Sequence, residues 1–240
     1  MDRNLFRFPH TPHLAWLGTV APRDDKVLSA AEAQAVLSGE IEIEIEEKLD
    51  GANLGFSLAE NGQPQAQNRG QYLSQPPIGQ FARLPAWLAQ HGDALYAVLE
   101  PSLILFGEWC AARHSLDYDR LPDWYLLFDV YDRAAGRFWN SARRDELARV
   151  AGLAVVPRLA TGRYTNAQLK TLVSDMPSRV RGGGPLEGVV VRRNDGNWCD
   201  KRAKLIRPDF TQAIDEHWRR RRTIEWNRVA PATPTTGGMF

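Results

Sequence analysis

Hydrophobic and polar residues alternate strictly in the segment 40–46, which reads EIEIEIE. A period of two is typical of a β-strand with one buried face, so Ile41, Ile43 and Ile45 are expected to face a core and the glutamates to face away. Short apolar segments bounded by turn residues predict three more strands, over 103–108, 125–131 and 188–192. Strands are therefore expected to dominate the middle of the chain.

Helices are predicted from the signals at their ends. Ser29 and Glu32 form a capping box, and Gly39 is expected to end the helix that they open. Similar signals predict helices over 141–150 (closed by Gly152), 165–177 and 210–227. The helices interrupt the strands irregularly and not in βαβ order, which indicates an α+β fold with mainly antiparallel sheets.

Length and composition are typical of a globular protein. The chain has 240 residues, of which 43% are hydrophobic and 25% charged, enough for one good core. No apolar run approaches the roughly 18 residues of a membrane helix, and the first residues lack the apolar core of a signal peptide, so a cytoplasmic protein is expected. Cys110 and Cys199 are the only cysteines, which excludes a disulfide scaffold and a CxxC-type zinc site.

Residues 1–228 contain no clear domain boundary, and the segment 229–240, rich in Pro, Thr and Gly, is expected to be a disordered tail. The net charge is +1, but residues 1–60 hold 5 Lys/Arg against 11 Asp/Glu, and residues 201–240 hold 9 against 4. A basic end suits the binding of a polyanion beside an acidic, metal-binding region. Two solvated faces of opposite charge would give the same pattern.

The segment 47–53, EKLDGAN, departs from the strand pattern that precedes it. The alternation predicts an apolar residue at position 47, and Glu47 stands there instead. Lys48 would continue the polar face of the strand, and Asp50 and Gly51 would begin a turn. On its own, such a string is also typical of a surface hairpin.

Five further motifs follow Lys48: N-R-G at 68–70, F-G-E at 106–108, F-D-V at 128–130, L-E-G-V-V at 186–190 and R-A-K at 202–204. Together with K-L-D-G at 48–51, the set resembles the covalent nucleotidyltransferases, which include ATP-dependent DNA and RNA ligases and mRNA capping enzymes. The stretches FPHTPHL, RHSLDYDRLPDWYLLFDVYDR and KLIRPDF are most similar to the RNA ligase family, including its nick-sealing branch. The resemblance covers residues 5–215.

The resemblance implies that Lys48 attacks the α-phosphorus of ATP, forms a lysine–AMP phosphoramidate and releases pyrophosphate. At a pKa of about 10.4 the amine is rarely neutral at pH 7, a handicap of about 4–5 kcal/mol. Neighbouring carboxylates would increase this handicap, whereas a divalent metal would oppose them and neutralise phosphate charge. Mg²⁺ or Mn²⁺ suits a site with carboxylates and no Cys/His cluster, and the resemblance assigns the metal to Asp50 and Glu187.

The resemblance also implies how the nucleotide is held. Glu108 matches the family's glutamate that hydrogen-bonds the ribose hydroxyls. Phe128 matches the aromatic residue that stacks on adenine, although FDVY would equally be a buried strand. Arg69 matches the arginine that contacts the nucleotide and later the 5′-phosphate of the nucleic acid. Glu47 and Asn53 flank the nucleophile and are expected to contact base and phosphate.

The last motif departs from the family pattern, which has two lysines two residues apart. Here Arg202 precedes Lys204 at that spacing, and Lys201 stands just before it. Lys204 is assigned to the α-phosphate, where its charge would serve both adenylation and transfer. Arg202 is a further candidate because arginine can bind phosphate through two nitrogens. Whether Arg202 or Lys201 makes the second contact with phosphate stays open.

Four other segments allow two interpretations each. His10 and His13 are flanked by prolines that disfavour helical metal geometry, so surface packing is expected. His114 would meet either the nucleic acid or no ligand. The segment 181–185, RGGGP, suits a flexible turn better than a phosphate cradle. The segment 218–222, WRRRR, on the predicted C-terminal helix is expected to bind phosphate backbone, with a solvated helix end as the alternative.

The motifs together predict an ATP-dependent RNA ligase of RNA repair, which joins 5′-phosphate and 3′-hydroxyl ends through lysyl-AMP and an adenylylated polynucleotide. The implied fold is an adenylyltransferase domain of two mainly antiparallel sheets with flanking helices. The expected partner is RNA, as a nicked duplex or an RNA/DNA hybrid. We expect no room for a full second nucleic-acid-binding domain such as an OB-fold, so either a partner protein or the basic C-terminal helix would supply strand contacts, or end-joining would be weak. The alternatives are a capping-type guanylyltransferase, a DNA ligase and a non-catalytic nucleic-acid-binding module.

Overall fold

Two sheets and four helices form most of the described part of the chain. The computed structural model describes residues 5–18, 26–38, 41–210 and 223–231. The helices are α1 (Ala30–Leu37), α2 (Leu84–Ala97), α3 (Ser141–Ala151) and α4 (Asn166–Asp175), with a 3-10 turn at Gly79–Phe81. The strands are β1 (Ile43–Lys48), β2 (Ala52–Leu58), β3 (Pro64–Gln67), β4 (Leu103–Trp109), β5 (Tyr125–Asp132), β6 (Arg137–Phe138), β7 (Ala154–Val155), β8 (Arg158–Gly162), β9 (Gly188–Asp195) and β10 (Trp198–Ile206).

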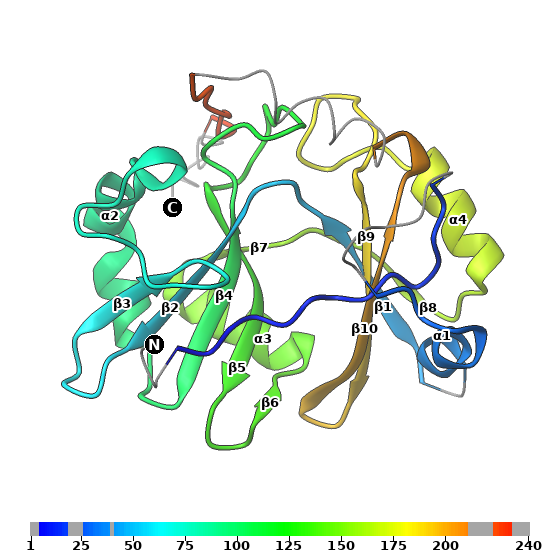
Figure 1. Cartoon of the computed structure of the whole chain (residues 1–240), viewed down its shortest axis with the longest axis horizontal. Helices are drawn as coiled ribbons and strands as arrows, with labels where there is room; N and C mark the ends of the chain where they lie inside the picture. Colours follow the sequence, from blue (N-terminus) through cyan, green and yellow to red (C-terminus); the bar gives the residue numbers. More distant parts are fainter. Residues whose placement is uncertain (1–4, 19–25, 39–40, 211–222, 232–240) are drawn as a thin grey trace, which may run out of the picture.

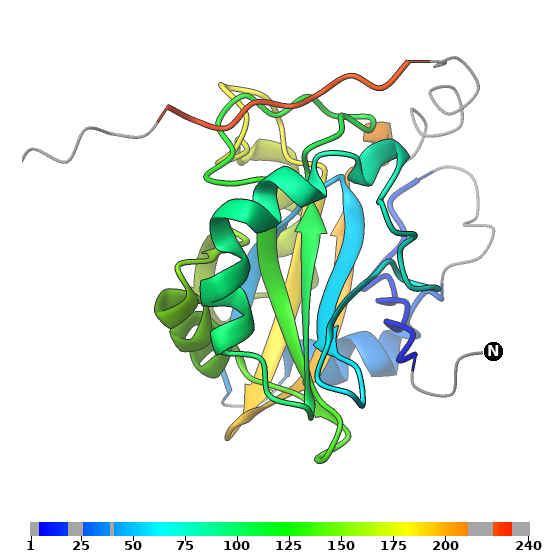
Figure 2. The same ribbon diagram turned by 90° about the vertical axis from the view of Figure 1, so that its left-hand side faces the viewer.

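The strands pair into two mainly antiparallel sheets that lie side by side (Figure 1). The first sheet has the order β10-β9-β1-β8, and the second has the order β3-β2-β4-β5-β6, with β7 added in parallel to β5. Helices α1 and α4 flank the first sheet, and Figure 2 shows α2 and α3 lying over the second. The predicted α+β class with two mainly antiparallel sheets and flanking helices is therefore confirmed.

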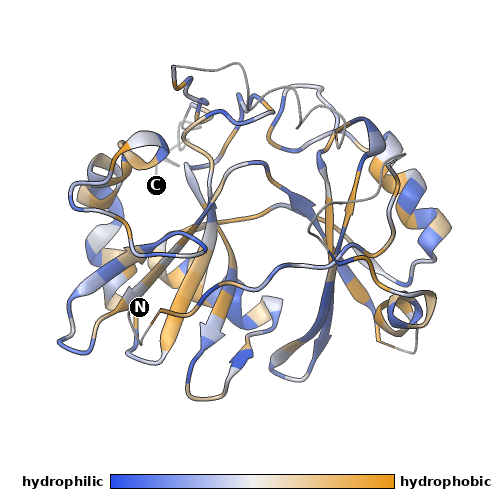
Figure 3. Ribbon diagram, viewed as in Figure 1, coloured by the Kyte–Doolittle hydropathy of each residue, from blue (hydrophilic) through white to orange (hydrophobic). Residues whose placement is uncertain are grey.

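Each sheet forms a hydrophobic core with its own helices. In the first sheet Ile45 packs in one cluster with Val36 of α1 and Leu169 of α4. In the second sheet Phe56 stacks on Trp87 of α2. Figure 3 shows β4 and β5 as largely hydrophobic, whereas the hairpin end of β9 and β10 is hydrophilic. The apolar surface buried on these faces stabilises the packing of each sheet against its helices. The gain in free energy is roughly 25 cal/mol per Å² of apolar surface removed from water.

Strand β1 comes from the EIEIEIE segment, and it differs from the prediction at two positions. Ile43 and Ile45 are buried as expected, but Ile41 precedes the strand and is 37% exposed. The expectation that the glutamates face away from the protein interior is wrong for Glu46, which is only 1% exposed. The second face of β1 is turned toward β5 and α3, so a charged residue there is buried and requires partners.

Five charged side chains meet between the sheets, and we call them the intersheet ion cluster: Glu46, Asp129, Arg144, Arg192 and Arg202. Glu46 lies 2.6 Å from Arg144 of α3 and 2.5 Å from Arg192 of β9. Asp129 of β5 lies 2.7 Å from Arg192 and 2.5 Å from Arg202 of β10. The cluster therefore ties β1, β9 and β10 of the first sheet to β5 and α3 of the second.

The end signals predicted three of the four helices. The capping box of Ser29 with Glu32 opens α1, and a second box, Thr165 with Gln168, opens α4. Helix α3 ends at Gly152, whose φ of 63° is in the left-handed region that favours glycine. Gly39, the expected end of the first helix, lies outside the described residues.

Helix α2 was not predicted because its start lacks a capping residue. Arg83 occupies the N-cap position and makes no side-chain cap, and only the proline at the first turn marks the start. Within the described ranges, no helix combines the length and apolarity needed to span a bilayer.

The predicted C-terminal helix is wrong over residues 223–227. Trp226 pairs with Ala112 and Val229 pairs with Leu121 as isolated bridges, so this segment is extended. Its backbone bonds with the loop after β4, and those bonds replace the ones that a helix would make internally. Residues 229–231, expected to belong to a disordered tail, continue the same segment. The basic stretch 218–222 and the rest of the tail, 232–240, lie outside the described residues.

Candidate active site

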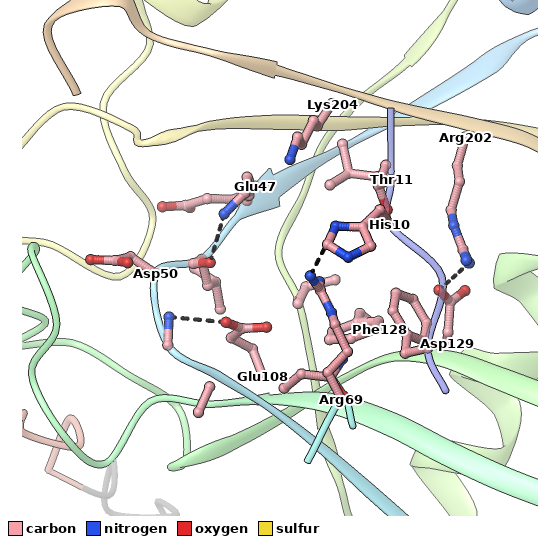
Figure 4. A pocket seen from close by; sticks show the side chains of 18 of the residues that line it. His10, Thr11, Glu47, Asp50, Arg69, Glu108, Phe128, Asp129, Arg202 and Lys204 are labelled. Carbon is pink, nitrogen blue, oxygen red and sulfur yellow. Dashed lines mark hydrogen bonds and ion pairs between the residues drawn. The ribbon is translucent and has the colours of Figure 1, made fainter. Parts of the chain in front are cut away.

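A cleft of about 550 Å³ collects side chains from both sheets (Figure 4). Nine of the ten predicted site residues line it: Glu47, Lys48, Asp50, Asn53, Arg69, Glu108, Phe128, Arg202 and Lys204. The tenth, Glu187, contacts Lys48 directly. The fold therefore brings together residues that are spread over most of the described chain.

Lys48 ends β1, where it pairs with Gly188 of β9. Its Nζ lies 2.5 Å from Oε1 of Glu187. Burial disfavours the ammonium, but the charges of Glu187, Glu108 and Asp50 outweigh burial and raise the pKa of Lys48 above its usual value. The amine of the free protein is therefore an ammonium, which must lose a proton before it can act as a nucleophile.

Two glycines allow the strands to close around this lysine. A Cβ at Gly51 would lie 2.6 Å from the carbonyl oxygen of Trp109, and a Cβ at Gly188 would lie 2.3 Å from that of Leu205. Both distances are too short for any side chain. The Gly51 N–H donates to Oε1 of Glu108 at 2.9 Å, so the turn after Lys48 also positions that carboxylate.

Asp50 is held by the loop that follows β4. Its Oδ2 accepts hydrogen bonds from the backbone N–H groups of Ser115 at 2.7 Å and Leu116 at 2.9 Å. Its own N–H donates to the hydroxyl of Tyr118 at 2.7 Å. The carboxylate and the backbone of Asp50 are thus fixed by one loop from the other sheet.

The carboxylates of the cleft retain protons unusually well. Burial raises the pKa of Glu108 to about 7, against the lowering effect of Lys48 and of the Gly51 N–H. Burial likewise raises the pKa of Glu187 to about 8, although Lys48 lowers it. Asp50 adds a further negative charge that raises both values. Three carboxylates around one amine therefore leave an excess of negative charge, which protons relieve.

We expect the free protein to lose stability as the pH rises from about 5 to about 8. In the unfolded chain Glu108 and Glu187 would ionise near pH 4.3, whereas in the folded protein they keep their protons to higher pH. The native state then binds more protons, so raising the pH favours unfolding. Glu108→Gln still accepts from Gly51 but has no proton to lose, so its melting temperature should depend less on pH.

Thermal unfolding of both proteins across this pH range tests the expectation. Glu100→Gln, at an exposed position, is the matched control and should follow the wild-type profile. Parallel profiles for Glu108→Gln and the wild type would show that Glu108 is already ionised in the folded protein.

Glu47 anchors the loop that precedes β9. Its Oε1 accepts from the hydroxyl of Ser178 at 2.5 Å, and its Oε2 accepts from the N–H of Arg179 at 2.8 Å. Burial raises the pKa of Glu47 above its usual value. These bonds explain why a glutamate interrupts the apolar face of β1. The expected contact of Glu47 with the nucleotide stays a prediction.

Unpaired polar atoms and one aromatic ring lie along the opposite side of the cleft. Asn53 Oδ1 and Arg69 Nε are buried and have no hydrogen-bond partner among the described residues. Such atoms cost free energy unless a ligand satisfies them. The ring of half-buried Phe128 meets Phe8 edge-on, with the centroids 5.3 Å apart. Arg69 also donates to Nδ1 of His10 at 3.4 Å.

Arg202 and Lys204 enter the cleft from β10 in different ways. The guanidinium of Arg202 is bound to Asp129 and lies over the rings of Phe8 and Phe138, at 4.6 and 4.1 Å from their centroids. Its contact with phosphate stays a prediction. Lys204 extends in Figure 4 toward the side of the cleft that holds Glu47. Lys201, the other candidate, is 40% exposed and pairs with its neighbour in sequence.

Asp50 and Glu187 suit a divalent cation that arrives with a nucleotide. In the part of the chain that the structure describes, no three His, Cys, Asp or Glu side chains form a ready-made metal site. Oε2 of Glu187, however, is buried without a hydrogen-bond partner there. Mg²⁺ and Mn²⁺ take oxygen ligands, and Mg²⁺ commonly combines one or two carboxylates with waters and phosphate oxygens. The donor set therefore fits such an ion.

Several residues that line the cleft were not predicted from the sequence, or were predicted with two alternative roles. His114 belongs to the cleft, where its Nε2 lies 2.8 Å from Oε1 of Gln80 and burial lowers its pKa. Gln80, Thr11 and Asn68 also line the cleft; no residue pattern around Gln80 indicates a site, whereas Asn68 belongs to the N-R-G motif at 68–70. His10 is exposed, as surface packing predicts, but it also lines the cleft. For His13 the expected surface position is wrong, because it is only 2% exposed. For His10 and Thr11 the only signal was the likeness of FPHTPHL to a known family.

Comparison with known proteins identifies relatives of this arrangement. A sequence model described as RNA ligase matches residues 41–206, well over half of the chain. Among solved structures, a lysine-to-alanine variant of Naegleria gruberi RNA ligase with ATP and Mn has a TM-score of 0.58 and 19% identity, covering 75% of this chain and 53% of that chain. An arginine-to-alanine variant with ATP and Mn has a TM-score of 0.61 and 17% identity, covering 92% and 60%.

The same ligase with PPi has a TM-score of 0.54 and 21% identity, covering 75% of this chain and 52% of that chain. The present chain thus spans between half and three fifths of the length of these ligase structures. At such identities the likeness concerns the fold. No curated protein matches the sequence significantly.

Proposed function

This chain belongs to the RNA ligase family, and on that premise we propose that it joins the 5′-phosphate and 3′-hydroxyl ends of RNA, using ATP, through a lysyl-AMP intermediate on Lys48. One observation carries the proposal: Nζ of Lys48 lies 2.5 Å from Glu187 at the side of a cleft that also holds Asp50, Glu108 and Lys204. Structures of similar fold contain ATP and Mn, which supports nucleotide and metal use.

The nucleotide would bind across the cleft. Phe128 offers an apolar ring face for adenine, and Glu108 lies where it can hydrogen-bond the ribose. Asn53 Oδ1 and Arg69 Nε offer an acceptor and a donor that lack partners among the described residues. The phosphates would then point toward Lys48 and Lys204, whose positive charges attract them.

In the first step Nζ of Lys48 attacks the α-phosphorus, an N–P bond forms, and the bond to the bridging oxygen of pyrophosphate breaks. The proton of the ammonium passes to Glu187, the carboxylate 2.5 Å away. Burial raises the pKa of Glu187 to about 8, so the ionised form that can take this proton becomes populated only as the pH approaches that value. A Mg²⁺ or Mn²⁺ ion near Asp50 and Glu187 would supply positive charge that lowers the pKa of Lys48 and neutralises phosphate.

In the second step the AMP moves from Lys48 to the 5′-phosphate of the RNA, where Arg69 would hold the phosphate. In the third step the 3′-hydroxyl of the other strand attacks that phosphate and expels AMP. Lys204 would offset the charge that develops at phosphorus in all three steps. The RNA is expected as a nicked duplex or an RNA/DNA hybrid in a cytoplasmic repair role, with strand contacts from the C-terminal residues or a partner protein.

Covalent labelling tests the proposal. The protein is incubated with α-labelled ATP or GTP and Mg²⁺ or Mn²⁺, denatured, and separated from free nucleotide. A label from ATP supports a ligase, a label from GTP supports a capping-type guanylyltransferase, and no label supports a non-catalytic binding module. Labelled protein is then offered nicked RNA, nicked hybrid, nicked DNA and single strands, and the joined product identifies the substrate.

Replacement of Phe128 separates its two possible roles. Phe128→Leu keeps most of the apolar volume against Phe8, so its thermal stability should stay close to that of the wild type. Base–aromatic stacking contributes about 1–3 kcal/mol, so the KM for ATP in the labelling reaction should rise about tenfold or more. An unchanged KM in Phe128→Leu, with a destabilised Phe128→Ala, would show that the ring serves only packing.

A further inference from the structure

The loop 110–121, which follows β4, hydrogen-bonds Asp50. Three bonds make this connection: Ser115 N–H and Leu116 N–H to Oδ2, and Asp50 N–H to the hydroxyl of Tyr118. Two peptide N–H groups bound to one carboxylate oxygen fix the direction of the carboxylate. The direction of Asp50 therefore depends on how firmly this loop is held.

The loop is held by the side chain of Asn227. Its Oδ1 accepts from the N–H of Tyr118 at 2.9 Å, and its Nδ2 donates to the carbonyl oxygens of Cys110 at 2.8 Å and Ala112 at 3.4 Å. Asn227 is 5% exposed. One amide thus joins both ends of the loop segment that binds Asp50. Its donor and acceptor match two carbonyls and one N–H, a combination that a carboxylate or a hydroxyl cannot supply at once.

The segment around Asn227 is itself anchored. Backbone hydrogen bonds join Asn227 to Ala111 and Arg228 to Tyr118. The ring of Trp226 lies under the guanidinium of Arg83, 4.1 Å from its centroid. Residues 225–230 therefore form a fixed strap across the loop, which we call the C-terminal strap.

We propose that Asn227 and Tyr118 are positioning residues, which hold Asp50 in place through the 110–121 loop without touching the substrate. The proposal rests on the proposed function for the role of Asp50 in metal-assisted adenylation of Lys48. The path has two links: Asn227 fixes the backbone of Tyr118, and the hydroxyl of Tyr118 fixes the backbone of Asp50. Loosening either link lets the carboxylate move away from the amine that it serves.

Two variants break the path, and each has a matched control. Tyr118→Phe removes the hydroxyl that accepts from Asp50, and Tyr125→Phe removes an equally buried tyrosine hydroxyl, which donates to Leu105 in the second sheet. Asn227→Ala removes the amide. Its control, Arg228→Ala, removes an exposed side chain of the same strap and keeps the backbone N–H of residue 228 that donates to Tyr118.

Amide hydrogen exchange tests whether Asn227 and Tyr118 hold the loop at Asp50, and it does so without labelling of Lys48. In Asn227→Ala and Tyr118→Phe, the N–H groups of Ser115 and Leu116 should exchange about tenfold faster or more, because the hydrogen bond that holds them is weakened. Asp50→Asn should give the same change at the same two amides. Arg228→Ala and Tyr125→Phe should leave these amides as protected as in the wild type. Equal exchange in all variants would overturn the proposal.

Labelling of Lys48 tests the consequence. In Asn227→Ala and Tyr118→Phe the Mg²⁺ concentration for half-maximal labelling should rise about tenfold, while the KM for ATP at saturating Mg²⁺ stays near the wild-type value. Combining the two changes should add little, because both act on one path. The proposal would be overturned if the half-maximal Mg²⁺ concentration rose equally in the control variants. It would also be overturned if the rise in the double variant equalled the product of the two single rises. If the wild type takes no label at all, the proposed function fails, and the exchange experiment still decides on the path.

Discussion

Lys48→Ala is expected to remove the covalent nucleotide from the protein. The label should fall to background, at least about a thousandfold below the wild type, because the change removes the amine that lies next to Glu187 in the cleft. Lys204 lies on another strand, where its place in the cleft suits charge neutralisation. The measurement is the labelling assay with ATP and Mg²⁺, quantified after denaturation.

Two controls make this result specific. Lys170→Ala, on the exposed side of α4, should label like the wild type. Thermal unfolding of Lys48→Ala should remain cooperative. The change removes a positive charge and increases the excess of negative charge, but Glu187 can hold a proton that relieves this excess. A label that persists in Lys48→Ala would show that another residue is the nucleophile.

Glu46→Ala is expected to destabilise the protein more than any other single change discussed. Arg144 and Arg192 are both buried, and each loses a carboxylate at 2.5–2.6 Å. Breaking a buried ion pair by removing one partner costs about 3–5 kcal/mol, since an uncompensated charge remains in the interior. Urea unfolding should show this loss as a lower midpoint at an unchanged slope.

Glu44→Ala is the matched control, because Glu44 stands two residues earlier on the same face of β1. Its partner Arg158 is 41% exposed, so the pair contributes no more than about 1 kcal/mol. A similar loss in both variants would mean that the intersheet ion cluster is solvated and does not join the sheets. A large loss only in Glu46→Ala would establish it as the link between them.

Local patterns in the sequence predicted much of the fold. The strict alternation identified β1, and the capping boxes at Ser29 and Thr165 marked α1 and α4, because these signals act within one turn or one strand. The burial of Glu46 could not be predicted in this way. It depends on Arg144 and Arg192, which lie about a hundred and more residues further along the chain, and alternation says nothing about what covers the second face.

The candidate site was predicted as a set of motifs, and the structure places that set in one cleft. The order of the motifs could not indicate which of their polar groups form hydrogen bonds or ion pairs with other residues of the protein. Glu47 is bound by Ser178 and Arg202 is bound by Asp129, and both contacts depend on the packing of separate elements. Residues 225–227 of the C-terminal strap were predicted as a helix and residues 229–230 as a disordered tail, because pairing with a loop more than a hundred residues earlier leaves no periodic signal.

The position of β1 inside the first sheet bears on how the chain acquires activity as it is synthesised. Its two neighbours are β8 and β9, so the strand that carries Lys48 leaves the ribosome well before either of them. Until residue 195 has emerged, Ile43 and Ile45 have no completed sheet to cover them, and such delayed long-range pairing slows folding and favours aggregation. If the proposed function holds, a nascent chain arrested before β9 should therefore take no label from ATP.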